Sequence, residues 1–142
     1  MIYIHIPYCR SFCTYCDFYS EVAPKCSTYE DFAKALSAEI RARKEEIAEN
    51  LACRTGVDTL YIGGGTPSVL PLGVLESFLT TLESVGCRNS FSEFTVEVNP
   101  EDIIEKGEDY VRGLAALGVN RISMGVQSFD DGILKWMNRR HS

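Results

Sequence analysis

Four short apolar segments alternate with segments of helical periodicity along this chain, and the alternation constrains the fold more than any other feature. Residues 2–6, 57–62, 93–98 and 119–124 are the segments that resemble strands. Their starts lie 55, 36 and 26 residues apart, which is too far for hairpins and suits parallel strands joined by helical crossovers. The sequence therefore predicts an α/β fold built from parallel β/α units.

The length limits how many such units the chain contains. An eight-unit parallel β/α barrel needs roughly 250 residues, and this chain has 142, so only about four units fit. The spacing of apolar residues predicts a helix over 27–51, opened by a capping box at Ser27, and another over 71–86. Gly107 interrupts the third pattern, so we expect a turn and then a helix there, and Ser128 is expected to open a fourth helix.

Charge and cysteine content restrict the partners and the compartment. The net charge is −6, which repels a phosphate backbone, so we expect no nucleic-acid partner. We expect no transmembrane segment and no signal peptide, hence a cytoplasmic protein with reduced thiols. Cys26, Cys53 and Cys87 show no mutual spacing and are interpreted as structural or surface thiols.

The other three cysteines form the clearest motif, CxxxCxxC, at Cys9, Cys13 and Cys16, directly after the first predicted strand. Three neighbouring thiolates suit a 4Fe-4S cluster, whose four irons are usually all bound by cysteine. One iron would then lack a protein ligand and could bind a substrate or cofactor. Two alternatives remain open, namely a zinc site completed by a distant Cys or His, and three unconnected thiols.

A glycine run, Gly63-Gly64-Gly65-Thr66-Pro67, follows the second predicted strand. Glycines without Cβ atoms allow a ligand to approach the backbone. The run matches neither a P-loop nor GxGxxG, which disfavours a triphosphate or a dinucleotide. The alternative is a turn that simply needs flexible residues.

Polar residues also occur at strand ends. Glu97 alternates with buried positions of its strand and would suit an ammonium group or a ribose hydroxyl, or else an ion pair with a helix lysine or arginine. Gln127 is expected to end the fourth strand on the same kind of face, with Arg139 following; either could instead be solvated. Tyr3 and His5 share a face of the first strand, and His5 is interpreted as a structural residue.

Together, the cysteine motif, the glycine run, Glu97 and the segment 121–129 resemble the radical S-adenosylmethionine (SAM) enzymes. Within them, the chain is similar to the branch that contains oxygen-independent coproporphyrinogen III oxidase and the haem chaperone HemW. The resemblance extends from Tyr3 to His141. It implies parallel (β/α) units forming the first half of a partial TIM-type barrel. Residues 1–142 would then be the N-terminal portion of one radical SAM core domain, with the remaining barrel and a C-terminal domain absent.

The resemblance also implies the cofactors and their ligands. The three cysteines would hold a 4Fe-4S cluster whose open iron is chelated by SAM, and one electron would cleave SAM to methionine and a 5′-deoxyadenosyl radical. No catalytic side chain beyond the cluster site is implied. The expected contacts to a first SAM are Tyr3, Gly64 and Glu97, and those to a second SAM are Tyr15, Gly65, Thr66, Gln127 and Arg139.

One departure distinguishes the two branches. The oxidase typically has a fourth cysteine two residues after the third, whereas Cys16 here is followed by Asp17 and Phe18. This ending is the HemW-like form, which implies haem binding and delivery to an acceptor protein rather than decarboxylation of coproporphyrinogen III. A small electron-transfer protein would be the reductant. The oxidase is the alternative, and a zinc-stabilised binding domain is the alternative of another class.

Overall fold

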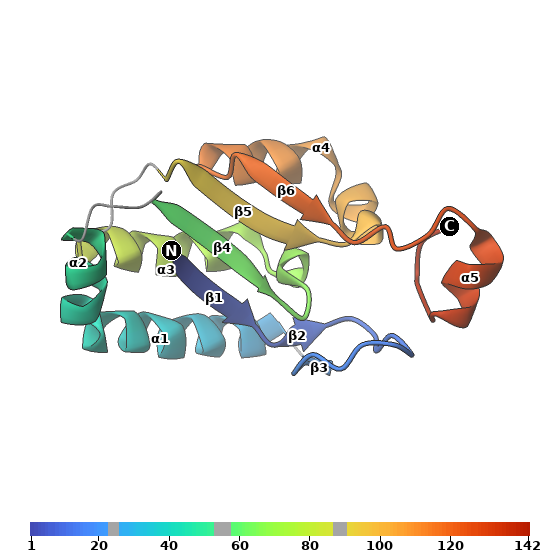
Figure 1. The fold of residues 1–142 in the computed structure, drawn as a ribbon, viewed down its shortest axis with the longest axis horizontal. Coiled ribbons are helices and arrows are strands. Elements are labelled where there is room, and N and C mark those ends of the chain that lie inside the picture. The colour runs from blue at the N-terminus through green and yellow to red at the C-terminus, as the bar shows by residue number, and fades with distance from the viewer. Residues whose placement is uncertain (23–25, 53–57, 87–90) are drawn as a thin grey trace.

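The computed structural model describes residues 1–22, 26–52, 58–86 and 91–142 (Figure 1). Cys53, Cys87 and Val57, the first residue of the second predicted strand, lie outside these residues. The side chains of Cys26 and Ser27 also lie outside the description, and with them the predicted capping box.

Four parallel strands form the central sheet, in the order β1 (Ile2–Ile6), β4 (Thr59–Gly64), β5 (Glu93–Val98) and β6 (Arg121–Met124). The α/β class and the parallel sheet are therefore confirmed. Because the strands run parallel, their carboxyl ends meet at one edge of the sheet, which is where ligand sites form in such folds.

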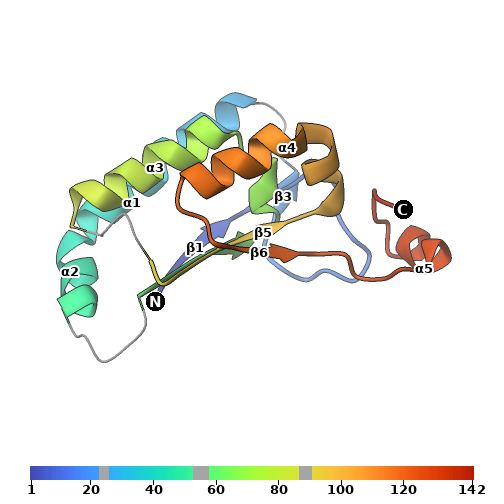
Figure 2. The ribbon, with the colours of Figure 1, turned by 90° about the horizontal axis from the view of Figure 1, so that it is seen from above.

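The helices α1 (Cys26–Ala42), α3 (Leu72–Ser84) and α4 (Pro100–Ala116) all cover the same face of the sheet (Figure 2). The core lies between these helices and alternate strand residues, including Ile62 and Val96, both 0% exposed. Side chains with the opposite alternation, such as Glu97, therefore project from the face that the helices leave free. Within the described residues, none of the helices is both long and apolar enough to cross a membrane.

The prediction of a single helix over 27–51 is wrong, because the chain turns at Arg43 and continues as α2 (Lys44–Ala52). The turn sends α2 off the axis of α1, close to the chain's amino terminus (Figure 1). Ile47 of α2 packs against the same core as Ile40 of α1. The apolar spacing was thus continuous while the helix axis was not, since both helices bury their apolar side chains in one core.

Glycine and capping residues shape the later helices. Gly107 has φ 72° inside α4, which confirms the predicted interruption, but the segment before it is helical from Pro100 and not the expected turn. The short helix α5 (Asp131–Trp136) is capped by Asp130, whose Oδ1 accepts from Ile133 N at 2.9 Å. The expectation that Ser128 opens this helix is wrong, because the Ser128 hydroxyl instead accepts from Asp130 N at 3.1 Å.

A half-buried lysine holds the short 3-10 turn η1 (Pro67–Val69) that follows the glycine run. Lys106 Nζ donates to the carbonyls of Ser68 and Leu70 at 2.6 and 2.8 Å. It also lies 4.2 Å from the centroid of the Tyr110 ring. Burial lowers the pKa of Lys106 to about 8.

The low pKa of Lys106 predicts a pH-dependent contribution to stability. Above pH about 8 the folded chain releases this proton, whereas the unfolded chain keeps it until about pH 10.4. Stability rises with pH wherever the unfolded state binds more protons. The free energy of unfolding of the wild type, relative to Lys106→Met, should therefore increase between pH 8 and pH 10. Urea titrations of both proteins across this range would contradict the prediction if the difference stayed constant.

Candidate functional site

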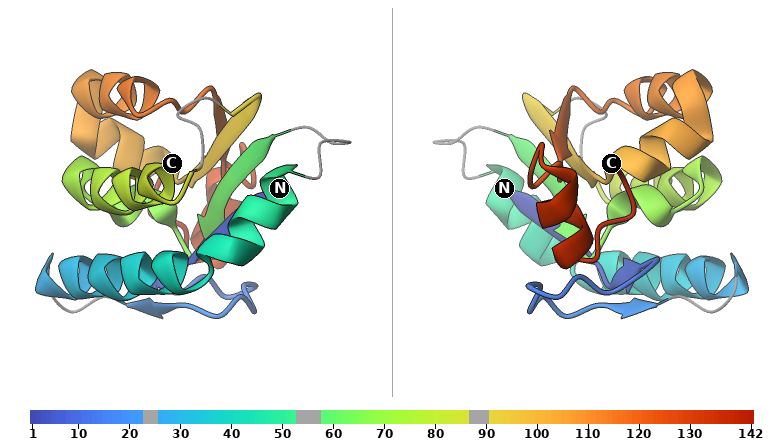
Figure 3. Two further views of the ribbon diagram at one scale, coloured as in Figure 1. Left: turned by 90° about the vertical axis from the view of Figure 1, so that its left-hand side faces the viewer. Right: turned by 90° about the vertical axis from the view of Figure 1, so that its right-hand side faces the viewer.

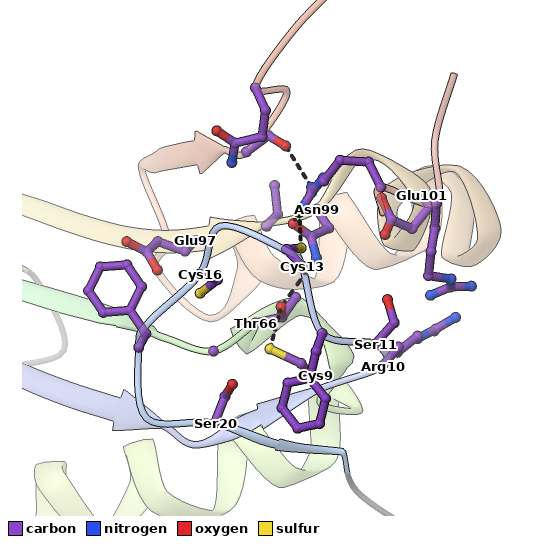
Figure 4. Close-up of a pocket in the computed structure, with 18 of the residues that line it drawn as sticks. Cys9, Arg10, Ser11, Cys13, Cys16, Ser20, Thr66, Glu97, Asn99 and Glu101 are labelled. Atoms are coloured by element: carbon purple, nitrogen blue, oxygen red, sulfur yellow. Dashed lines mark hydrogen bonds between the residues drawn. The ribbon is translucent and has the colours of Figure 1, made fainter. Parts of the chain in front are cut away.

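A cavity of about 350 Å³ lies at the carboxyl ends of the strands. Its walls come from the segment after β1, the ends of β4 and β5, and the chain after β6 (Figure 4). Nearly every predicted site residue lines it, namely Cys9, Cys13, Cys16, Tyr15, Gly64, Gly65, Thr66, Glu97, Gln127 and Arg139. Tyr3 is the one predicted site residue outside the cavity lining.

The cysteines lie on a loop that a small second sheet closes. The strands β2 (Tyr8–Cys9) and β3 (Glu21–Val22) pair in parallel, and Glu21 N donates to Pro7 O at 2.7 Å. This pair was missed by the sequence reasoning, because two-residue strands carry no periodic signal. The loop contacts the far end of the chain, where Thr14 N donates to Met137 O at 3.3 Å beside α5 (Figure 3).

All three thiols are free and differ in exposure. Cys9 and Cys13 are half-buried, and Cys16 is exposed. Within the described parts of the chain, no three His, Cys, Asp or Glu side chains converge closely enough to hold a single metal ion. The three sulfurs instead line one cavity from separate positions.

A hydrogen-bond network connects two of the thiols through Asn99, which the sequence reasoning did not single out as a site residue. Thr66 Oγ1 lies 3.5 Å from Cys9 Sγ and accepts from Asn99 Nδ2 at 3.2 Å. Arg139 Nη2 donates to Asn99 Oδ1 at 2.8 Å, and its Nη1 donates to Cys13 Sγ at 3.4 Å (Figure 4). The available signal was the alternation that places Asn99 on the same strand face as Glu97.

The glycine run brings the end of β4 against the cysteine loop. Gly64 has φ 115°, a conformation that side chains other than glycine rarely adopt. A Cβ atom on Gly65 would lie 2.7 Å from Tyr8 O and 3.0 Å from Cys9 Sγ. Gly65 N and Thr66 N donate to Ile6 O and Tyr8 O, each at 2.7 Å. These glycines therefore serve the close approach of two chain segments as well as lining the cavity.

Glu97 is held by neutral donors. The Tyr61 hydroxyl donates to Glu97 Oε1 at 2.6 Å and Gly64 N donates to Oε2 at 3.2 Å. The hydrogen bond to Glu97, together with burial, raises the pKa of Tyr61. Among the described residues Glu97 has no cationic partner, so the predicted alternative of an ion pair with a helix residue is not what the structure shows. Its charge is left for a group in the cavity.

Tyr3 stacks on the ring of Tyr61, with centroids 6.0 Å apart, and burial followed by the charge of Glu97 raises the pKa of Tyr3. The exposed Tyr3 hydroxyl pairs with His5 Nδ1 at 3.1 Å, and His5 Nε2 lies 2.9 Å from Tyr19 O. A carbonyl only accepts, so His5 Nε2 donates to Tyr19 O, and Nδ1 pairs with the Tyr3 hydroxyl. His5 thereby ties β1 to the return of the cysteine loop, in line with its structural interpretation.

Gln127 and Arg139 reach the cavity in ways that differ from the sequence expectation. The strand β6 ends at Met124, and Gln127 lies beyond it with φ 67°, so the expectation that Gln127 ends the strand is wrong. Arg139 is not a solvated side chain, because Gly125 O accepts from its Nη2 at 2.7 Å. Tyr15 lines the same wall, and burial followed by the neighbouring Cys13 raises its pKa.

Residues 3–142 match the radical SAM superfamily. The chain belongs to this superfamily. Radical SAM proteins carry a 4Fe-4S cluster and SAM, so the family itself implies these two cofactors.

Relatives of two kinds match nearly the whole chain. The haem chaperones HemW of Lactococcus lactis and Bacillus subtilis are 37% and 35% identical, over 99% and 98% of this chain. The oxygen-independent coproporphyrinogen III oxidase of Bradyrhizobium diazoefficiens is 28% identical over 99% of the chain. The chain spans about a third of the length of these relatives, 34%, 35% and 30% respectively.

A solved structure also supports the assignment to the radical SAM superfamily. Coproporphyrinogen III oxidase (HemN) of Escherichia coli, described as a radical SAM enzyme, matches with a TM-score of 0.80 and 30% sequence identity. The match covers 99% of this chain and 30% of that one. The TIM-barrel-type fold expected from the sequence is thereby confirmed for the region described.

The residues present fit the radical SAM cofactors. A cluster accepts one thiolate at each of several irons, which matches three sulfurs that line one cavity without converging on a point. Arg139 also lines the cavity, and its buried Nε has no hydrogen-bond partner among the described residues. Glu97 offers the opposite charge across the same cavity.

Proposed function

We propose that this chain is the cluster- and SAM-binding part of a HemW-like haem carrier, and that residues 1–142 form the N-terminal portion of one radical SAM core domain. The observation that carries the proposal is the single cavity lined by three thiols, the Arg139 guanidinium and the Glu97 carboxylate, which has no cationic partner among the described residues. The HemW-like branch is favoured over the oxidase by Asp17 and Phe18, which follow Cys16 where the oxidase carries a fourth cysteine.

The residues divide the cavity between them. Cys9, Cys13 and Cys16 would hold the cluster, which with SAM supplies one-electron cleavage of a carbon–sulfur bond. Glu97 and the adjacent Gly64 backbone would bind the ammonium or ribose hydroxyls of a first SAM. Tyr3 supports that carboxylate through Tyr61. A second SAM would contact the remaining predicted residues of the cavity, namely Tyr15, Gly65, Thr66, Gln127 and Arg139.

The proposal includes three partners. Haem would be the ligand, a cytoplasmic haem-acceptor protein would receive it, and a small electron-transfer protein would be the reductant. The second candidate is coproporphyrinogen III oxidation, which the structural match to HemN favours. Anaerobic reconstitution with iron and sulfide, followed by haem titration and a porphyrinogen turnover assay on the full-length protein, tests the two functions. Haem binding without turnover would support the carrier, and turnover would support the oxidase. Failure of the protein to take up iron and sulfide would overturn both.

Glu97→Gln is expected to weaken SAM binding to the reconstituted protein. The neutral amide keeps the size of the side chain but removes its charge, and hydrogen bonds to charged groups contribute about 1.5–3 kcal/mol. We expect at least about a tenfold increase in the dissociation constant, measured by equilibrium dialysis with labelled SAM. Glu93→Gln is the matched control, because Glu93 lies at the other end of β5 near Arg121. Equal affinities for wild type and Glu97→Gln would contradict the assignment of Glu97.

A further inference from the structure

A single amide, Asn99, supports the hydrogen-bond donors to two of the three cysteine sulfurs. Its orientation follows from the chemistry of its neighbours. Arg139 has donors only, so the Asn99 oxygen must face it and Nδ2 is left to donate to Thr66. Because Thr66 Oγ1 accepts from Asn99, its own proton is free for Cys9. Once the cysteines are deprotonated they accept, and both donors are directed at them.

The amide is also fixed in place by its backbone. Asn99 N donates to Ser68 Oγ at 3.1 Å, and Ser68 Oγ donates to Asp102 Oδ2 at 2.6 Å. Ser68 and Asp102 are 0% and 1% exposed. From the other side, Gly125 O accepts from the Arg139 guanidinium at 2.7 Å. Asn99 therefore sits between two anchored groups and has little freedom to release either donor.

Hydrogen bonds to ligand sulfurs are among the factors that set the potential of iron–sulfur clusters. A donor stabilises the more electron-rich reduced cluster and so raises the reduction potential. We propose that Asn99 is a positioning residue that raises the reduction potential of the cluster by holding Arg139 against Cys13 and Thr66 against Cys9. The inference rests on the proposed function, since it requires the three cysteines to bind a cluster.

The test is the midpoint potential of the anaerobically reconstituted chain, measured by a mediated redox titration followed by EPR. Asn99→Ala should lower the reduction equilibrium constant about tenfold, which is a 59 mV shift for one electron. Asn99→Asp should also lower it, because the carboxylate adds negative charge and draws the Thr66 proton away from Cys9. Thr66→Val removes one donor only and should give a smaller shift in the same direction.

Asn120→Ala is the matched control, because the Asn120 amide accepts from Phe94 N at 2.8 Å at the opposite end of β5. It should leave the potential unchanged. Failure of the wild-type chain to bind a cluster would overturn the proposed function. If the wild type binds a cluster but Asn99→Ala has the same midpoint potential, or Asn120→Ala shifts the potential equally, only the role of Asn99 would be overturned. If Asn99→Ala does not take up iron, Asn99→Asp and Thr66→Val decide the question, and unchanged potentials in both would overturn the inference.

Discussion

Cys13→Ala should abolish cluster binding, taking the iron content of the reconstituted protein from about four atoms per chain to near zero. With only three local cysteines, each iron held by the protein depends on one thiolate. The loss of one thiolate therefore leaves two of the four irons without a protein ligand. Cys13 also receives the Arg139 guanidinium, so its removal leaves that half-buried cation without its sulfur acceptor. Iron and acid-labile sulfide analysis, together with the visible spectrum, measures the effect. Cys9→Ala and Cys16→Ala should behave alike.

Cys53→Ala and Cys87→Ala are the controls, because neither belongs to the CxxxCxxC motif. Each should retain the full iron content. An intact cluster spectrum in Cys13→Ala would refute the assignment of the cysteines as ligands. A loss of iron in the controls as well would show that cysteine number, rather than the motif, governs uptake.

Asp102→Ala should lower the free energy of unfolding by about 3 kcal/mol. The Asp102 carboxylate is 1% exposed and accepts from the fully buried Ser68 hydroxyl. Its Oδ1 lies 3.0 Å from Arg10 Nε, an ion pair without good hydrogen-bond geometry. Removing the carboxylate leaves a buried hydroxyl without an acceptor and a cavity beneath the cysteine loop. Urea denaturation at pH 7 measures the change.

Glu105→Ala is the matched comparison, since Glu105 binds the same Arg10 from the surface and also contacts Arg140 at 2.9 Å. An exposed ion pair is screened by water, so this variant should lose much less stability. Equal losses in the two variants would show that the buried carboxylate has no special role. The two variants together separate burial from the shared charge of Arg10.

The elements with periodic sequences were predictable, and those defined by single contacts were not. Gly107 interrupts a helical pattern, and the structure has a left-handed residue there. By contrast, the turn at Arg43 follows from how two helices share one core, and the apolar spacing is unchanged across it. The β2–β3 pair was missed for a similar reason, because two residues are too few to show alternation.

The candidate site shows the same division. The cavity brings together nearly all residues expected from the motifs, because these motifs follow strands whose carboxyl ends meet at one edge. Tyr61, which supports Glu97, and Asn99, which joins two thiols, were not predicted as site residues. Tyr61 carries no spacing that distinguishes it, and the alternation that relates Asn99 to Glu97 does not by itself indicate a contact to the thiols. Their importance comes from partners more than thirty residues away along the chain.

The sequence by itself was enough to predict the parallel α/β class, the CxxxCxxC motif as the candidate cluster site, and the family. Each of these depends on the local spacing of residue types. Tertiary structure alone decided which side chains serve those cysteines. Arg139 reaches Cys13 across 126 positions of sequence, a contact created by the docking of the segment after α5 onto the cysteine loop. Tyr3 was separated from the cavity by the same means, since its strand lies at the edge of the sheet and Tyr61 stands between it and Glu97. Local patterns encode chemistry and periodicity, whereas the distances between donors and acceptors exist only once the sheet and its loops are packed.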